Sequence, residues 1–402
     1  MKFKRVASAF ALSLGLLSGA AHGQGLLSIG SNVDDFEQED IPLTWTASAY
    51  VGYDSNINSI DLAEESSIYL QAGIGVQWSG GSRTTRYTLG ASASVLYYFD
   101  DVEVNDDENV FYSIRLQGSV VHRASRRLTL SDSFYATYEY EPNQSIGATV
   151  SRRTDQYFYL YNNAALSYAW TRRFSTVVNW ATSGIIYDGD DVEDRWSNHI
   201  GLQGRYLWTR ATTLVGEYRF GFTEYENGGA DYISHYVLAG IDHMFSRNTM
   251  GTVRVGAEFR DYDNFDSKSS PYIEASLVQR LNEGFRLRWA ARYGLEDSEL
   301  GSFETRTSIR TGVTAEYDFS PRLTGTAGLT YVHSELEDSA IAGVSDGEED
   351  FFGINLGLSY LLYSNVRLEG GYSFGTLDSD IDFGISRDFD RHRVFVGMSA
   401  TF

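Results

Sequence analysis

The chain has 402 residues, no cysteine, 28 tyrosines and 23 phenylalanines, and its formal net charge is −22 at pH 7. Without cysteine, a disulfide scaffold, a thiolate zinc site and a cysteine nucleophile are excluded. The acidity argues against nucleic acid as a partner, because binding nucleic acid needs a basic face. Scarce proline, together with many glycine, tyrosine, serine and threonine residues, favours β structure.

The first element in chain order is a signal peptide, predicted over residues 1–23. Three basic residues within the first five precede an apolar run over residues 6–17, and small residues follow at Ala21 and Gly23. This arrangement predicts cleavage before Gln24 and export from the cytoplasm. The apolar run is too short for a spanning helix, which needs about 20 residues. Residues 24–43 are expected to form a periplasmic segment ahead of a β-barrel domain at 44–402.

From residue 44 onward, apolar and polar side chains alternate with a period of two. The segment Ser66–Ser79 places Ile68, Leu70 and Ile74 on one face and glutamine and glycine on the other. Strands in soluble sheets average about 5–6 residues, whereas a strand that crosses a bilayer at a tilt needs about 9–11. The length of the alternation therefore indicates membrane-spanning strands.

Eighteen such segments are predicted, an even number as bacterial barrels require. Asp132 and Gln279 interrupt the apolar faces of the fifth and twelfth segments, so a barrel of 16 strands is the alternative. The predicted segments begin near residues 44, 66, 84, 109, 128, 154, 174, 196, 213, 232, 250, 271, 285, 304, 323, 351, 366 and 390.

The predicted fold is an all-β, antiparallel, up-and-down transmembrane barrel with apolar side chains outward and polar side chains in the lumen. Closing the sheet removes its edges, and closure is obligatory in a membrane. Short and long connections alternate, which predicts periplasmic turns at one end and external loops at the other. The predicted loops include residues 55–65, 296–304, 335–350 and 378–390. Most of the acidic residues fall in the long connections, whereas the short turns are rich in arginine.

Aromatic residues cluster at the predicted strand ends, as two girdles at the membrane–water boundaries would require. They are Trp78, Trp170, Trp208, Phe245 and Phe319 at the short-turn end, and Tyr53, Phe99, Tyr138, Phe222 and Tyr293 at the loop end. The acidic loops either keep the surface solvated or bind divalent cations. The spacing of Asp378, Asp380 and Asp382 is similar to a calcium loop but lacks its bidentate glutamate, so no metal site is assigned.

Two stretches carry a resemblance to known outer-membrane proteins. The alternating run Val394, Val396, Met398, Ala400 and Phe402 resembles the C-terminal signal that such proteins present to the β-barrel assembly machinery. The stretch Gly52-Tyr53-Asp54-Ser55-Asn56 resembles the start of the putative β-barrel porin 2 family. That resemblance implies an outer-membrane barrel, often associated with exopolysaccharide gene clusters, with no catalytic motif to carry over.

Arginine supplies almost all of the positive charge beyond the signal peptide, and many arginines fall on lumen-facing positions. A guanidinium fork binds carboxylate or phosphate in a bidentate manner. These arginines either pair with carboxylates of the wall and loops, or guide an anionic solute as charged rings do in pores. The predicted basic strip consists of Arg254, Arg260, Arg286, Arg288, Arg292, Arg306 and Arg310.

The sequence therefore predicts a pore in the outer membrane, with membrane lipid as its surroundings and an anionic solute or polysaccharide as its cargo. A non-conducting structural barrel or adhesin is the first alternative. A lipid hydrolase is a remote one, because no serine lies in a recognisable nucleophile motif. No enzymatic activity and no cofactor are expected, and the sequence leaves the solute and the oligomeric state open.

Overall fold

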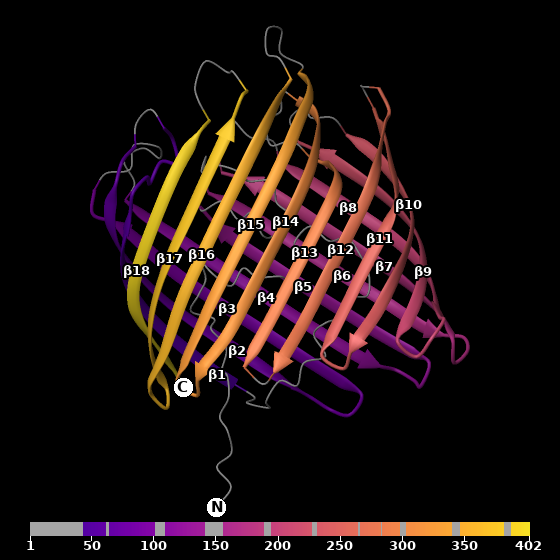
Figure 1. The fold of residues 1–402 in the computed structure, drawn as a ribbon, viewed down its shortest axis with the longest axis horizontal. Helices are drawn as coiled ribbons and strands as arrows, with labels where there is room; N and C mark the ends of the chain where they lie inside the picture. The colour runs from indigo at the N-terminus through magenta and orange to yellow at the C-terminus, as the bar shows by residue number, and fades with distance from the viewer. Residues whose placement is uncertain are drawn as a thin grey trace, which may run out of the picture.

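The computed structural model describes residues 43–61, 64–100, 109–140, 156–188, 194–226, 231–263, 266–282, 284–297, 303–339, 346–381 and 387–402. These residues form one sheet of 18 antiparallel strands, in which each strand pairs with its neighbours in sequence. The first and last strands also pair with each other, so the sheet closes into a barrel (Figure 1). The predicted 18-strand barrel is confirmed, and the 16-strand alternative is wrong.

The strands are 12 to 18 residues long, which is the length that a tilted crossing of a membrane needs. No helix in the described ranges is long and apolar enough to span a membrane. The strands are β1 Leu43–Asp54, β2 Ser67–Gly81, β3 Thr85–Tyr98, β4 Val110–Arg123, β5 Leu128–Glu139, β6 Tyr157–Ala169, β7 Phe174–Tyr187, β8 Arg195–Leu207, β9 Thr212–Tyr225, β10 Tyr232–Ser246, β11 Thr249–Tyr262, β12 Lys268–Asn282, β13 Phe285–Glu296, β14 Phe303–Ser320, β15 Leu323–Ser339, β16 Gly347–Tyr363, β17 Val366–Ser379 and β18 Phe389–Thr401.

Cross-strand register keeps one set of side chains outward around the whole barrel, because residues opposite each other share a face. Ile74, for example, pairs with Ala47 and Ala93, and it is 68% exposed. Inward positions carry arginine, carboxylate, tyrosine and serine side chains, many of them buried. The apolar face is therefore turned to the outside, which suits lipid and not water. The girdle residues Trp78, Trp170, Trp208, Phe245 and Phe319 are all exposed at the short-turn end.

The seam between β1 and β18 explains the Gly52–Asn56 stretch. A Cβ on Gly52 would lie 2.4 Å from the ring of Tyr69 and 2.6 Å from the carbonyl oxygen of Val394, so only glycine fits. Asp54 accepts hydrogen bonds from Arg391, with Nε at 3.0 Å from Oδ1, and from the Tyr98 hydroxyl at 3.0 Å. A backbone hydrogen bond from the Ser55 N–H to the His392 carbonyl oxygen, at 2.9 Å, then joins Ser55 to β18. The stretch therefore fastens the first strand to the last.

Some strands extend further toward the loop end than predicted. β16 begins at Gly347 rather than near residue 351, and β15 continues to Ser339 although a loop was predicted from residue 335. The outward residues there, Glu335 and Glu348, are acidic and lie opposite each other. Pairing thus continues where the apolar alternation has already ended, so these two boundaries were predicted wrongly. The signal peptide and residues 24–42 lie outside the described residues.

Candidate functional site: the charged wall of the lumen

The inward side chains of β8–β14 form a continuous wall of charge, hereafter the charged wall. Cationic side chains outnumber carboxylates on it. The cations are Arg195, Arg205, Arg219, Arg254, Arg260, Lys268, Arg280, Arg286, Arg288, Arg292, Arg306 and Arg310, and the carboxylates are Glu217, Asp242, Glu258, Glu274, Glu296, Glu316 and Asp318, joined by Asp297 just after β13.

The middle of the charged wall is a chain of ion pairs that crosses from β8 to β12. Asp242 forms ion pairs with Arg205 at 2.5 Å and with Arg254 at 2.7 Å. Arg254 also approaches Glu217 at 3.8 Å, and Glu217 in turn pairs with Arg219. Both Arg219 and Arg254 are 1% exposed. Each buried guanidinium thus has a carboxylate partner, as burial of a charge requires.

At the centre of the charged wall, arginine guanidinium groups stack on tyrosine rings. Arg219 lies over the rings of Tyr236 and Tyr272, at 5.8 and 5.6 Å from the ring centroids, and Arg292 lies on Tyr272 at 5.7 Å. The Tyr272 hydroxyl donates to Glu274 at 2.7 Å. Stacking against an aromatic face stabilises a guanidinium and fixes its plane. The wall therefore presents oriented guanidinium groups rather than mobile side chains.

At the loop end, Asp297 draws together strands that are far apart in the sheet. It pairs with Arg260 of β11 at 3.1 Å and with Arg195 of β8 at 3.4 Å. The Tyr232 hydroxyl of β10 also donates to it. Neighbouring strands are about 4.8 Å apart, so a contact between β8 and the end of β13 must run across the interior. Asp297, the residue directly after β13, therefore reaches across the lumen.

The seven residues of the predicted basic strip all belong to the charged wall, but their surroundings differ. Arg254 and Arg260 are buried and form the ion pairs described above. Arg310 donates two hydrogen bonds to Glu296, at 3.0 and 3.3 Å. The remaining four are Arg286, which pairs with Glu316; Arg292, which donates to the Leu295 carbonyl; Arg306, which donates to Ser334; and Arg288.

Arg288 differs from the others. It is partly exposed to the lumen, and within the described ranges it has no ion pair or side-chain hydrogen bond. It stands between Val278 of β12 and Thr314 of β14, with no carboxylate directly opposite. Its charge is therefore the one on the strip best placed to act on a passing solute.

A second inward surface is made of tyrosines on β5–β7. Tyr157, Tyr159 and Tyr161 follow one another along the inward face of β6, and Tyr135 and Tyr187 flank them on the neighbouring strands. Arg115 lies over Tyr135 at 5.7 Å and pairs with Glu139 at 2.7 Å. Aromatic faces of this kind can stack on sugar rings or other flat apolar surfaces. This surface continues directly into β8 and the charged wall.

Several charged residues of the lumen were missed from the sequence. Asp54, Glu349, Arg387, Arg391 and Arg393 form ion pairs close to the closing seam. Arg387 falls within the predicted loop 378–390, and Asp54 directly precedes the predicted loop 55–65. The signal that could have revealed them is parity, since Arg391 and Arg393 alternate with the outward residues of β18.

The remaining predicted sites can be located in the fold. Val394, Val396, Met398, Ala400 and Phe402 lie on the outward side of the closing seam. Their role in assembly stays a prediction. Within the described residues, no group of three or more histidine, aspartate or glutamate side chains could hold a metal ion. Of the calcium-like spacing, Asp382 lies outside those residues.

Several solved structures have a similar fold. OccAB4 from Acinetobacter baumannii has 15% identity and a TM-score of 0.45, with 90% of this chain and 98% of that chain covered. OccK2 (OpdF) from Pseudomonas aeruginosa has 11% identity and a TM-score of 0.47, covering 90% and 98%. OpdK from Pseudomonas aeruginosa, solved with vanillate, has 14% identity and a TM-score of 0.46, covering 89% and 99%. No curated protein matches the chain.

The sequence profile of one family, described as putative beta-barrel porin 2, matches residues 234–402. The match begins in β10 and continues to the end of β18, so it includes five of the seven strands that carry the charged wall, β10 from its third residue onward. Together with the closed barrel and its apolar exterior, this match confirms the predicted resemblance: residues 234–402 are similar to the putative beta-barrel porin 2 family, and the protein is a porin-like β-barrel of the outer membrane.

Proposed function

We propose that the barrel is a pore that favours small anionic solutes, and that acidic saccharides are the class that suits it best. The observation that carries this proposal is the excess of cations over carboxylates on the charged wall. A wall with fixed positive charge raises the local concentration of anions and lowers that of cations. The adjoining tyrosines of β5–β7 supply faces on which a sugar ring could stack.

The ion pairs of the charged wall do not remove the preference for anions. They hold the wall together and, within the described ranges, leave Arg288 without a carboxylate partner. Arg219 and Arg254 are neutralised by Glu217 and Asp242, so their role is to hold the wall together. Arg288 lacks such a partner within the described residues. A solute carboxylate would meet this guanidinium without first displacing a protein carboxylate. A link with exopolysaccharide export rests on the family resemblance alone.

The two alternatives have less support. The close pairing of the buried charges would also suit a structural barrel or adhesin that conducts nothing. A lipid hydrolase needs a serine activated by a histidine, and in the part of the chain that the structure describes no serine hydroxyl bonds to a histidine ring. The outward histidines contact threonine, tyrosine or aspartate instead.

The test replaces Arg288 with serine and measures the reversal potential of single barrels in a planar bilayer under a KCl gradient. One fixed charge that acts through water at several ångströms contributes about 0.5 kcal/mol, so R288S should lower the anion-to-cation permeability ratio about twofold. Arg86 is the matched control, because it is an inward arginine near the turn end of β3 and lies outside the charged wall. R86S should change the ratio less.

Two results would count against the proposal. Equal effects of R288S and R86S would mean that the charged wall has no special role. Barrels that fold and insert but carry no current would favour the structural barrel. An unchanged heat-dependent shift in gel migration confirms that each variant is folded.

A further inference from the structure

The lipid-facing side of β5 carries a carboxylate where an apolar residue is expected. Asp132 pairs with Val120 of β4 and Ala164 of β6, which places it on the outward face. The outward residues around it are apolar, among them Leu130 and Leu166, both exposed. An ionisable group facing hydrocarbon is costly and calls for a partner.

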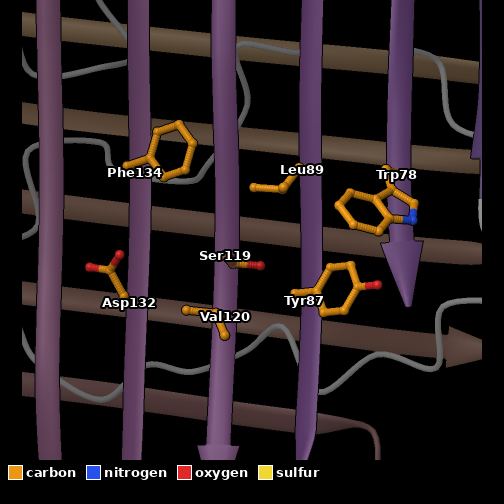
Figure 2. Close-up of a pocket in the computed structure, with 7 residues that line it drawn as sticks. All are labelled: Trp78, Tyr87, Leu89, Ser119, Val120, Asp132 and Phe134. Atoms are coloured by element: carbon orange, nitrogen blue, oxygen red, sulfur yellow. The ribbon is translucent and has the colours of Figure 1, made fainter. Parts of the chain in front are cut away.

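A groove lies beside this carboxylate on the outer face of β2–β5 (Figure 2). Gly118 lies on the same face and pairs with Leu89 and Phe134, which both line the groove. A Cβ there would come within 3 Å of Phe134 and Leu89, whose side chains lean over the glycine from both sides. The groove has a volume of about 310 Å³ and is lined by Trp78, Tyr87, Leu89, Ser119, Val120, Asp132 and Phe134.

The partners of Asp132 leave its charge unbalanced. Asn162 of β6 donates to Oδ1 at 3.0 Å. Within the described ranges, no arginine, lysine or histidine forms an ion pair with Asp132. Its neighbours in the groove supply apolar carbon and aromatic edges but no cation. The groove thus has an apolar lining and a negative charge at one end.

The position of the groove along the barrel indicates which membrane leaflet it meets. Asp132 is the fifth residue of β5, which starts at Leu128 directly after a short turn. The groove also contains Trp78 and Tyr87, whose rings pack edge to face with centroids 4.9 Å apart. Aromatic residues of this kind lie at the headgroup level. At the turn end, this is the periplasmic leaflet, which consists of phospholipid.

We propose that the groove binds one phospholipid with a primary ammonium headgroup, of the phosphatidylethanolamine class. One acyl chain lies along Trp78, Leu89 and Phe134, and the ammonium group donates to the free oxygen of Asp132. Charge complementarity selects this occupant, because an ammonium group balances the carboxylate in a medium of low dielectric constant. A lipid whose headgroup carries only a phosphate would be repelled. The exposed arginines of the turn that precedes β5, Arg126 and Arg127, suit the phosphate of the same headgroup.

The site lies outside the lumen and is independent of the proposed pore. Asp132→Asn keeps the size and shape of the side chain and removes its charge, so it tests the ammonium contact without filling the groove. Val120→Phe is the complementary variant, because it keeps Asp132 and fills the space between Tyr87 and Asp132. Neither residue faces the lumen, so conductance should be unchanged in both variants.

The experiment titrates brominated phosphatidylethanolamine or brominated phosphatidylglycerol into the full barrel in an uncharged maltoside micelle and records tryptophan fluorescence. Bromine on an acyl chain that lies against Trp78 quenches its fluorescence, and Trp78→Phe identifies that component. We expect half-quenching at an about fivefold lower concentration of phosphatidylethanolamine than of phosphatidylglycerol, as one charge-assisted contact provides. D132N should remove the difference, and V120F should reduce the quenching of Trp78 by both lipids to the level that annular lipid gives.

Equal quenching by the two lipids that D132N leaves unaltered would overturn the proposal, because it would show ordinary annular lipid. A barrel dimer in light scattering that D132N dissociates would also overturn it, in favour of a second copy on this face. Heat-dependent gel migration establishes that the variants are folded, so loss of binding is separable from loss of structure.

Discussion

Asp297 shows how two opposing effects set the charge of a single group in the lumen. Burial alone would raise the pKa of its carboxyl, but Arg195 and Arg260 hold that pKa below its ordinary value. The carboxylate therefore stays ionised at neutral and mildly acid pH. Because its pKa is lower in the folded than in the unfolded state, its stabilisation is complete above the unfolded pKa and is lost as pH falls through the folded pKa.

Replacing Asp297 with asparagine should lower the free energy of unfolding by about 1–3 kcal/mol at pH 7, the cost of leaving a charged partner unsatisfied. The difference between wild type and D297N should stay constant from pH 7 to pH 5 and shrink at lower pH. Urea unfolding in micelles at several pH values measures both quantities. A difference that already shrinks between pH 7 and pH 5 would contradict the lowered pKa.

Residue-level contacts of this kind could not be predicted from the sequence. The parity of a strand predicts which way Arg260 faces, and it faces the lumen as expected. Parity does not indicate that Asp297, assigned to a loop, reaches the strand that begins at Arg195. That contact depends on where the chain places Asp297 as it leaves β13, and no local pattern encodes that placement.

Among the elements, the closing seam between β1 and β18 joins the two ends of the chain. Asp54 is fully buried there. It forms ion pairs with Arg391 and Arg393 and accepts a hydrogen bond from the Tyr98 hydroxyl. Removing one member of a buried ionic cluster leaves the others unpaired. An exposed pair such as Arg286–Glu316, in which both side chains are about a third exposed, is screened by water and contributes little.

We therefore expect D54N to destabilise the barrel by about 3–5 kcal/mol and the matched variant E316Q by about 1 kcal/mol or less. The urea midpoint of unfolding in micelles measures the comparison. If the two variants lose equal stability, Asp54 does not stabilise the seam more than an exposed ion pair does.

The strands themselves were readily predicted, because burial on one face only imposes a period of two that any reader of the sequence can see. All 18 were located, including β5 and β12 despite Asp132 and Gln279. Their loop-side ends were less well placed, since β16 continues beyond the apolar belt with acidic outward residues. Hydrogen bonding of the backbone, not side-chain polarity, sets those boundaries.

Across the whole molecule, the net charge of −22 conceals two regions of opposite sign. In the sequence, acidic residues are concentrated in the long connections, whereas the charged wall presents an excess of arginine to the lumen. If the loops controlled permeation, the barrel would prefer cations. The proposed function requires the charged wall to control it, so ion selectivity separates these two descriptions.

The most direct test is the reversal potential of the wild-type barrel in a planar bilayer under a KCl gradient. The charged wall predicts chloride selectivity that is strong at about 0.1 M salt and weaker at about 1 M, because the screening length falls from about 10 Å to about 3 Å. A cation-selective barrel, or a folded and inserted barrel that carries no current, would contradict the account.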